Sequence, residues 1–374
     1  MESSSKDLTI ATLYPLPKLR VFDSELQKWE EKFPFENQFP IVDKNTYLGI
    51  EVETENVQKY DSSPPYWTMI EDGSLRNQGR EFITPPIRAW RIEQALDTLF
   101  NRSLNASIDF SERTSIHVHM NIRTLTVKQL ETLILTYIVF EKALFSFAGK
   151  ERYENIFCVP IIETTIGSRL QSLIQHREFD ISWEKYTALN LVPITSKGTI
   201  EFRHLAGTKD IKRIITWINL ILCLKKFALK NSPDYIWDRI KTLNTTSEYK
   251  MFADEVFEDM VQAIWNKDFN KDVGTCVTYV KQTCIVNKFQ NELYLKEIEG
   301  YKPEASENYY EEIFDPSDLP QTRGIRYQPG TIISAAALGI QESPWGNLNF
   351  TPTPEVPAAP TISNLTRNLL ARGT

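Results

Sequence analysis

Four short segments of the sequence place ionisable side chains on one face of a predicted strand and apolar side chains on the other. Alternate side chains of a β-strand point to opposite faces of its sheet. In "YLGIEVETE", residues 47–55, Glu51 and Glu53 therefore share a face. Two carboxylates on one face repel each other, and burying either without a partner is costly. A positively charged partner is expected on that face.

The other three segments show the same asymmetry. They are "GREFITPP" at 79–86, "SIHVHMNI" at 115–122 and "GTIEFRHL" at 198–205. The side chains on their polar faces are Glu81, His117, His119, Asn121, Glu201 and Arg203. An antiparallel sheet with one solvated face is the ordinary explanation. We favour convergence on divalent cations, because lysine is absent from these positions and the residue types are those that bind metal ions.

The residue types on the polar faces indicate which cation they would bind. Carboxylate-rich sites with few imidazoles suit Mg²⁺ or Mn²⁺, whereas zinc prefers more Cys and His. The pair His117 and His119 could hold zinc, which leaves a zinc hydrolase as an alternative. The sequence contains no H-E-x-x-H, G-x-S-x-G, G-x-x-x-x-G-K-[ST] or G-x-G-x-x-G motif. A nucleotide, if bound, would therefore not lie on a P-loop or a classical dinucleotide-binding fold.

The composition indicates a folded protein with an acidic balance. Of the 374 residues 41% are hydrophobic, and the formal net charge of −7 argues against a general nucleic-acid binder. The four cysteines lack C-x-x-C spacing and are expected to be free thiols. No apolar signal core is present, and Glu141 and Lys142 interrupt the most apolar window, so no membrane span is predicted. A cytoplasmic location is expected.

The chain is predicted to have three parts. Residues 1–40 form a polar, proline-containing arm with a short helix around 23–33, and residues 41–300 form the main domain. Residues 301–374 form an extension with a Pro-rich spacer. The last segment, 363–374, is either a frayed tail or a short helix that docks on a protein partner.

Hydrophobic periodicity predicts the elements of the main domain. Strands are predicted at 46–54, 66–71, 79–84, 115–122, 186–192 and 198–205. Helices are predicted at about 88–101, 126–148, 164–176, 209–230 and 250–267. This mixture predicts an α+β fold, a curved antiparallel sheet with helices on one face. His204 falls on the apolar face of its strand and is expected in the core.

The motifs "GIEVE", "EDGSL…GREFITPP", "SIHVHMNI" and "NLVP…GTIEFRHLAGT" together make the sequence resemble the amidoligase family. The resemblance covers roughly residues 45–225, outside the arm and the tail. It implies a glutamine-synthetase-like catalytic fold and an ATP-dependent carboxylate–amine ligase of the kind that phages and bacteria encode. ATP would phosphorylate a carboxylate to an acyl phosphate, and an amine would attack it to give an amide, ADP and phosphate.

The resemblance implies metal ligands for two or more Mg²⁺ or Mn²⁺ ions. Glu51 and Glu53 match an E-x-E metal strand and would face different ions of one cluster. His117 is the first histidine of a run similar to the H-x-H-M-S run of glutamine synthetases. Glu201 lies in an E-x-R strand similar to theirs, and Glu81 would be a further ligand.

The resemblance assigns other residues to ATP and to catalysis. His119 would contact a nucleotide phosphate, and Arg203 would stabilise charge on the transferring phosphoryl group. Asp72 would orient the amine or a metal-bound water, or would only shape a turn. Arg152 could reach a phosphate or lie on the surface. Asn190 could face the site as a cofactor-binding residue or satisfy backbone groups.

The expected activity is therefore amide formation from small-molecule or peptide carboxylates and amines, with ATP and Mg²⁺. In a phage-encoded member, the host cytoplasm would be its location. Two alternatives remain open from the residues alone. One is a metal-dependent hydrolase that uses the same cluster. The other is a non-catalytic phage structural or binding protein that kept the ligase fold.

Overall fold

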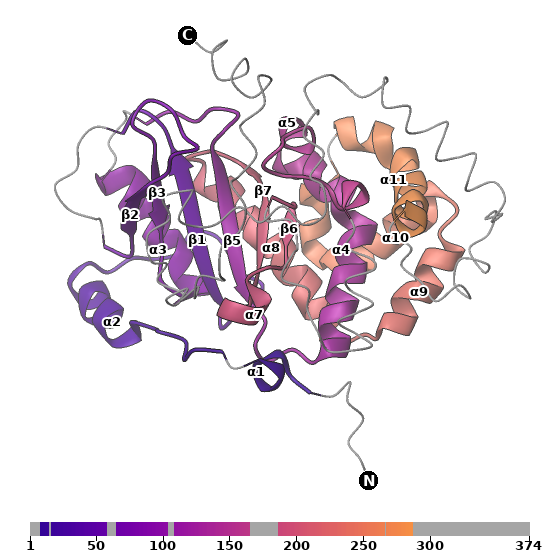
Figure 1. The fold of residues 1–374 in the computed structure, drawn as a ribbon, viewed down its shortest axis with the longest axis horizontal. Coiled ribbons are helices and arrows are strands. Elements are labelled where there is room, and N and C mark those ends of the chain that lie inside the picture. The colour runs from indigo at the N-terminus through magenta and orange to yellow at the C-terminus, as the bar shows by residue number, and fades with distance from the viewer. Residues whose placement is uncertain are drawn as a thin grey trace, which may run out of the picture.

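The structure is a computed structural model in which residues 8–14, 16–57, 65–103, 108–164, 186–265 and 267–286 are described. These residues form an antiparallel sheet with helices behind it and a group of helices beside it (Figure 1). This arrangement confirms the predicted α+β class. The predicted extension at 301–374 lies outside the described residues, as does all but the first residue of the helix expected at about 164–176.

The described part of the sheet has seven strands in the order β2-β3-β1-β5-β7-β6, with β4 paired to β1. All these pairs are antiparallel. The strands are β1 Tyr47–Thr54, β2 Thr68–Glu71, β3 Arg80–Ile83, β4 Ile87–Arg88, β5 Ser115–Asn121, β6 Leu189–Asn190 and β7 Thr199–Ala206. The strand expected at 186–192 is only two residues long. It ends there because the Asn190 side chain accepts the Val192 amide at 3.0 Å.

The apolar faces of the central strands form the middle of the core. Val118 on β5 pairs with Ile50 on β1 and with Phe202 on β7, and all three are fully buried. Burial of such a side chain stabilises a fold by about 1.5–3 kcal/mol. His204 is also fully buried on this side, and its Nε2 lies 2.7 Å from the hydroxyl of Tyr137. The expectation of a core histidine is confirmed.

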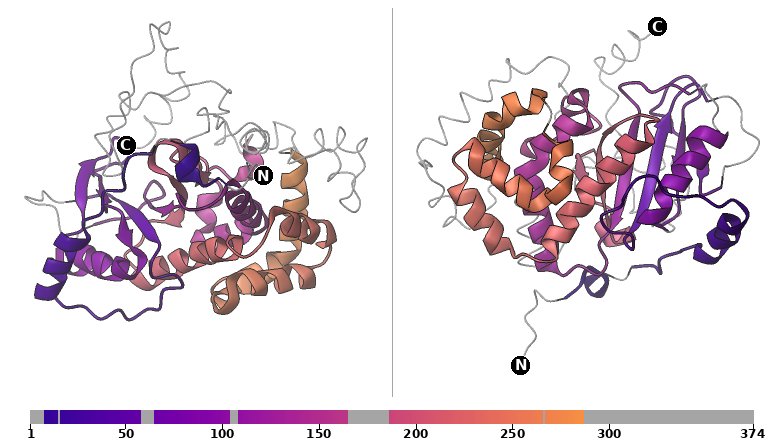
Figure 2. Two further views of the ribbon diagram at one scale, coloured as in Figure 1. Left: turned by 90° about the horizontal axis from the view of Figure 1, so that it is seen from below. Right: turned by 180° about the vertical axis from the view of Figure 1, so that it is seen from behind.

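Helices cover the apolar face of the sheet. The helices are α1 Ile10–Leu13, α2 Asp23–Lys32, α3 Ile92–Asp97, α4 Val127–Ala148, α5 Lys150–Tyr153, α7 Ile194–Lys197, α8 Ile211–Ala228, α9 Pro233–Thr242, α10 Thr246–Phe257 and α11 Lys267–Val286. Seen from behind, α3 and α8 cross the strands, while α4 and α11 stand beside them (Figure 2). The opposite face of the sheet carries the polar side chains described below.

Local sequence signals set the bounds of the long helices. Thr126 and Gln129 form a capping box at the start of α4, as residues of these types do at helix N-termini. Asp210 caps α8 by accepting the amide of Arg213 at 3.0 Å. These two helices confirm the predictions at 126–148 and 209–230. The helix expected at about 250–267 instead ends at Phe257, because Glu258 adopts a positive φ of 48°.

The N-terminal arm packs against the main domain. The side chain of Ile10 is fully buried, and its amide donates to the carbonyl of Leu125 at 2.9 Å. Helix α2 is held by the buried guanidinium of Arg91, which contacts Asp23 and lies 2.8 Å from Glu30. These contacts join the arm to the segments that directly precede α4 and α3.

Two findings in the described residues bear on the expectations from composition. Cys158, Cys223, Cys276 and Cys284 are all buried and free. None of the described helices is both long enough and apolar enough to cross a membrane.

Candidate functional site

The polar faces of β1, β3, β5, β6 and β7 bring most of the predicted site residues together. Glu51 is paired in register with His117, and Glu53 with Glu81. His119 is paired with Glu201, as is Asn190 on the far side of β7. Side chains of paired residues lie on the same face of a sheet. The residues on this face include Glu51, Glu53, Glu81, Ser115, His117, His119, Asn121, Asn190, Thr199, Glu201 and Arg203.

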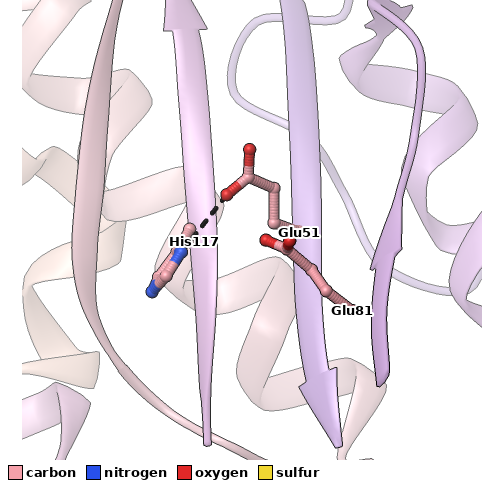
Figure 3. A group of neighbouring side chains, drawn as sticks. All are labelled: Glu51, Glu81 and His117. Carbon is pink, nitrogen blue, oxygen red and sulfur yellow. Dashed lines mark hydrogen bonds and ion pairs between the residues drawn. The ribbon is translucent and has the colours of Figure 1, made fainter. Parts of the chain in front are cut away.

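Glu51 lies at the centre of this face between two histidines. Its Oε1 is 2.9 Å from Nε2 of His119. Its Oε2 is 3.3 Å from Nδ1 of His117 (Figure 3). Burial raises the pKa of Glu51, but the positive charge of His119 is the main effect that lowers it. The pKa of Glu51 therefore lies well below its ordinary value of 4.5, and the group is an ionised carboxylate.

Glu201 and Arg203 form a buried ion pair beside His117. Arg203 Nη1 donates to Glu201 Oε1 at 2.5 Å, and Asn190 Nδ2 donates to Glu201 Oε2 at 2.6 Å. Burial raises the pKa of Glu201, but the charge of Arg203 dominates and holds it at about 2. Arg203 Nε donates to the carbonyl of Phe157 at 3.2 Å, which fixes the direction of the guanidinium. Asn190 Oδ1 accepts the amide of Val192, which is the predicted backbone role, and a role in cofactor binding stays a prediction.

Glu81 on β3 is the carboxyl group least compatible with its surroundings. Burial raises its pKa, and the charges of Glu51 and Glu53 raise it further, to well above 4.5. A bound cation would remove this repulsion and favour the ionised carboxylate. Without a cation, Glu81 therefore keeps its proton at a higher pH than an ordinary glutamate does.

Two sets of side chains have the composition and spacing of cation sites. One contains Glu51, Glu81 and His117, and the other contains Glu51, His119 and Glu201. In each set the ligand atoms lie within 4.8 Å of one another. Glu51 belongs to both sets, so its carboxylate could bridge two ions. Oxygen-rich sets with one imidazole each fit Mg²⁺ or Mn²⁺ better than zinc.

Two hydroxyl groups at the site were not predicted from the sequence. Ser115 Oγ lies 2.7 Å from His117 Nε2 and donates to Glu53 Oε2 at 2.5 Å. Thr199 Oγ1 lies 3.2 Å from His119 Nδ1. Ser115 has the same strand parity as the two histidines, which is the sequence signal that could have identified it.

Asp72 lies in the turn after β2. Its Oδ1 accepts the amide of Ser74 at 2.8 Å, which is the geometry of a turn-stabilising aspartate. Its charge also contributes to the raised pKa of Glu81, so the carboxylate lies near the edge of the cluster. The structure therefore supports the turn role, and a role with the amine or a metal-bound water stays a prediction.

Arg152 lies behind β7, where it is 1% exposed, so its interpretation as a surface residue is wrong. Its guanidinium donates to the carbonyls of Arg203 and His204 at 2.9 and 3.2 Å. These carbonyls belong to an irregularity in the β5–β7 pairing, where the two residues face the single residue His117. Arg152 thereby holds the main chain that carries Arg203. Contact with a phosphate stays a prediction, for which Nη1 is the nitrogen without a hydrogen-bond partner in the described structure.

Residues 40–225 match the family model described as "Putative amidoligase enzyme". This segment belongs to the amidoligase family. No curated protein sequence matches the chain. The amidoligase segment contains every strand of the described residues and every site residue described above, whereas α9, α10 and α11 follow it.

Proposed function

We propose that the chain is an ATP- and Mg²⁺-dependent carboxylate–amine ligase that forms an amide through an acyl phosphate, on a glutamine-synthetase-like catalytic fold. The observation that carries this proposal is the position of Glu51. One ionised carboxylate belongs to two sets of cation-ligand candidates on the polar face of an amidoligase segment. Phosphoryl transfer depends on neutralising phosphate charge, for which two cations on one face are well suited.

The side chains present fit the cations that the reaction needs. Glu51, Glu81 and His117 would hold one ion, and Glu51, His119 and Glu201 would hold another. The raised pKa of Glu81 supports this assignment, because burial and the charges of neighbouring carboxylates both disfavour its ionised form. When bound, the cations would neutralise the phosphate oxygens and the developing charge on the transferred group.

Arg203 is the residue that we assign to the charge of the transferring phosphoryl group. It is 7% exposed, and hydrogen bonds to Glu201 and to the carbonyl of Phe157 fix its position. A positive charge held in a buried site interacts more strongly than one in water and needs no reorganisation during the reaction. We propose that it stabilises the γ-phosphoryl group during transfer.

The reaction balances without an oxidant or a further reactant. A carboxylate oxygen of the first substrate attacks the γ-phosphorus of ATP, and ADP leaves. The amine nitrogen of the second substrate then attacks the acyl carbon, and phosphate leaves. The amine gives up a proton to solvent in this second step, and Asp72 at the edge of the cluster is our candidate to orient the amine. Small molecules or peptides in the cytoplasm are the substrates that we propose.

ADP formation with product identification tests the proposal. The full chain is incubated with Mg²⁺-ATP and pooled carboxylates and amines, beside Glu51→Gln, Arg203→Ala and the control Glu71→Gln, an exposed glutamate on β2. We expect amine-dependent ADP formation that is lost in the first two variants and kept in the control. ADP formation that is unchanged in Glu51→Gln would contradict the proposal. So would wild-type protein that retains zinc and does not bind Mg²⁺-ATP in isothermal titration, which would instead favour a hydrolase.

A further inference from the structure

Ser115 connects His117 to Glu53 through two short hydrogen bonds. The hydroxyl oxygen lies 2.7 Å from His117 Nε2 and 2.5 Å from Glu53 Oε2. All three side chains are buried, with exposed fractions of 2% for Ser115 and His117 and 6% for Glu53. Buried polar groups with fixed partners hold their orientation strongly.

The number of protons decides the direction of these hydrogen bonds. A serine hydroxyl has one proton to donate. Ser115 donates it to the carboxylate of Glu53, which can only accept when ionised. The oxygen of Ser115 is then an acceptor toward His117, so Nε2 of His117 carries a proton and donates it.

The other ring nitrogen of His117 faces the cluster. Nδ1 lies 3.3 Å from Glu51 and 3.4 Å from Glu201, both longer than an ordinary N–H···O hydrogen bond. It also lies 3.5 Å from Nη1 of Arg203, which can only donate. Nδ1 points toward Glu51, while the second nitrogen points away from Glu51 and Glu81 (Figure 3). Nδ1 is thus placed as an unprotonated ligand atom.

We propose that Ser115 and Glu53 are positioning residues that keep the proton of His117 on Nε2 and present Nδ1 to a cation shared with Glu51. Metal-binding histidines usually donate their second nitrogen to an outer group, which fixes the ring and its tautomer. Here the group that accepts from the second nitrogen is the hydroxyl of Ser115, which in turn donates to the carboxylate of Glu53. This inference rests on the proposed function, because it assigns the cation that His117 binds. In this proposal Glu53 accepts the hydroxyl proton of Ser115 and does not bind the cation, whereas the resemblance implied that it is a metal ligand.

Thr199 provides an internal comparison. Its hydroxyl lies 3.2 Å from Nδ1 of His119, and Nε2 of His119 faces Glu51. The two histidines therefore present opposite ring nitrogens to one carboxylate. The contact of Thr199 is longer than that of Ser115, and no carboxylate is found behind it in the described structure. We expect substitutions of Thr199 to change His119 and to leave His117 unchanged.

The tautomer of His117 can be measured without any cation or substrate. The chain has four histidines, so ¹⁵N NMR of histidine-labelled full-length protein resolves few signals, and His117→Gln assigns the one of interest. We expect a proton on Nε2 and an unprotonated Nδ1 in the wild type and in Ser115→Thr. We expect Ser115→Ala to lose this preference for a proton on Nε2 of His117, and Thr199→Val to keep it. A wild-type signal with the proton on Nδ1 would overturn the proposal.

Cation affinity gives the second measurement. Mn²⁺ alone is titrated calorimetrically into the wild type, Ser115→Ala, Ser115→Thr and the control Ser103→Ala, whose hydroxyl binds the carbonyl of Thr98 away from the site. We expect about 10- to 100-fold weaker binding in Ser115→Ala, restored by Ser115→Thr and unaffected in the control. Equal affinity in wild type and Ser115→Ala would refute the role of Ser115.

The two measurements also separate this proposal from the proposed function. Wild-type protein that does not bind Mn²⁺ would contradict the metal-dependent ligase. The NMR pattern would still decide whether Ser115 fixes the proton of His117. If Ser115→Ala does not fold, the wild-type NMR pattern and the comparison with Ser115→Thr decide the question.

Discussion

Glu53 on β1 is paired directly with Glu81 on β3, so two carboxyl groups lie opposite each other on one face of the sheet. Like charges in such a position destabilise a strand pair. Burial and the charges of Glu51 and Glu53 together raise the pKa of Glu81 well above 4.5. The pair thus lowers the stability of the cation-free protein, and a bound cation would remove the repulsion between the two carboxylates.

Replacing Glu81 tests this effect on stability. Glu81→Gln removes one partner of the repulsion at nearly constant shape. We expect the cation-free protein to gain stability by about 0.2–1 kcal/mol, and Mn²⁺ to bind at least several-fold more weakly. Thermal unfolding with a chelator and calorimetric titration give the two numbers. Glu71→Gln, on the exposed edge strand, is the control, and lower stability of cation-free Glu81→Gln would contradict the idea.

The buried ion pair of Glu201 and Arg203 predicts that removing one partner destabilises the fold more than removing both. Arg203→Met leaves the Glu201 carboxylate buried with only Asn190 and neighbouring histidines to compensate it. We expect a loss of about 3–5 kcal/mol in the free energy of unfolding, because an unpaired buried charge is costly. The double variant Arg203→Met with Glu201→Leu is expected to recover most of that loss. Urea unfolding in chelator measures both, and equal destabilisation in the single and double variants would disprove the explanation.

Glu141 on α4 predicts how stability depends on pH. It is fully buried and accepts hydrogen bonds from Tyr137 at 2.6 Å, from Tyr279 and from the amide of Ile161 at 2.9 Å. Burial nevertheless dominates and raises its pKa to about 7. The folded state therefore holds this proton more tightly than the unfolded state. The corresponding stability is fully present below pH 4.5 and is lost as the pH rises to about 7.

The variant Glu141→Gln isolates this contribution. The difference in pKa corresponds to about 3 kcal/mol, which the wild type should lose between these pH values. We expect the stability difference between the wild type and Glu141→Gln to change by that order across the range, because other titrating groups cancel. Urea midpoints measured at half-unit pH steps provide the comparison. A constant difference would show that Glu141 does not titrate there.

The ion pairs of Arg91 predict that the arm can be released without unfolding the domain. Arg91→Met removes the contacts with Asp23 and Glu30 that hold α2. We expect faster proteolysis within residues 16–40 and little change in the far-UV spectrum of the remaining chain. Limited proteolysis with mass spectrometry detects the cleavage sites. The control Arg102→Met removes an exposed pair with Asp97, and cleavage equal to that of this control would count against the prediction.

The polar face of the sheet was predictable from the sequence because strand parity is local. Glu51, His117 and Arg203 alternate with apolar residues, and the pleat of the backbone sends them to one face whatever the partner strand. Strand parity likewise predicted His204 in the core, and the periodicity of residues 126–148 predicted α4. These predictions depend on neighbours within a few residues.

The partners across the sheet were not predictable in this way. The pairing of Glu53 with Glu81, and the hydrogen bonds of Ser115, depend on the register between strands that are far apart in the chain. A shift of one residue would reverse the faces, and nothing local specifies the register. The position of Arg152 was left open for the same reason, because only the folded chain brings α5 against the irregular part of β7.

Strand periodicity in the sequence was therefore enough to assign side chains to the polar face and to indicate which kinds of ligand they could bind. The three-dimensional packing was needed to place Glu51 between His117 and His119, and Ser115 between Glu53 and the ring of His117. The reason is physical. The two-residue period follows from the backbone of each strand, whereas the meeting of side chains from different strands follows from the packing of the whole sheet against its helices.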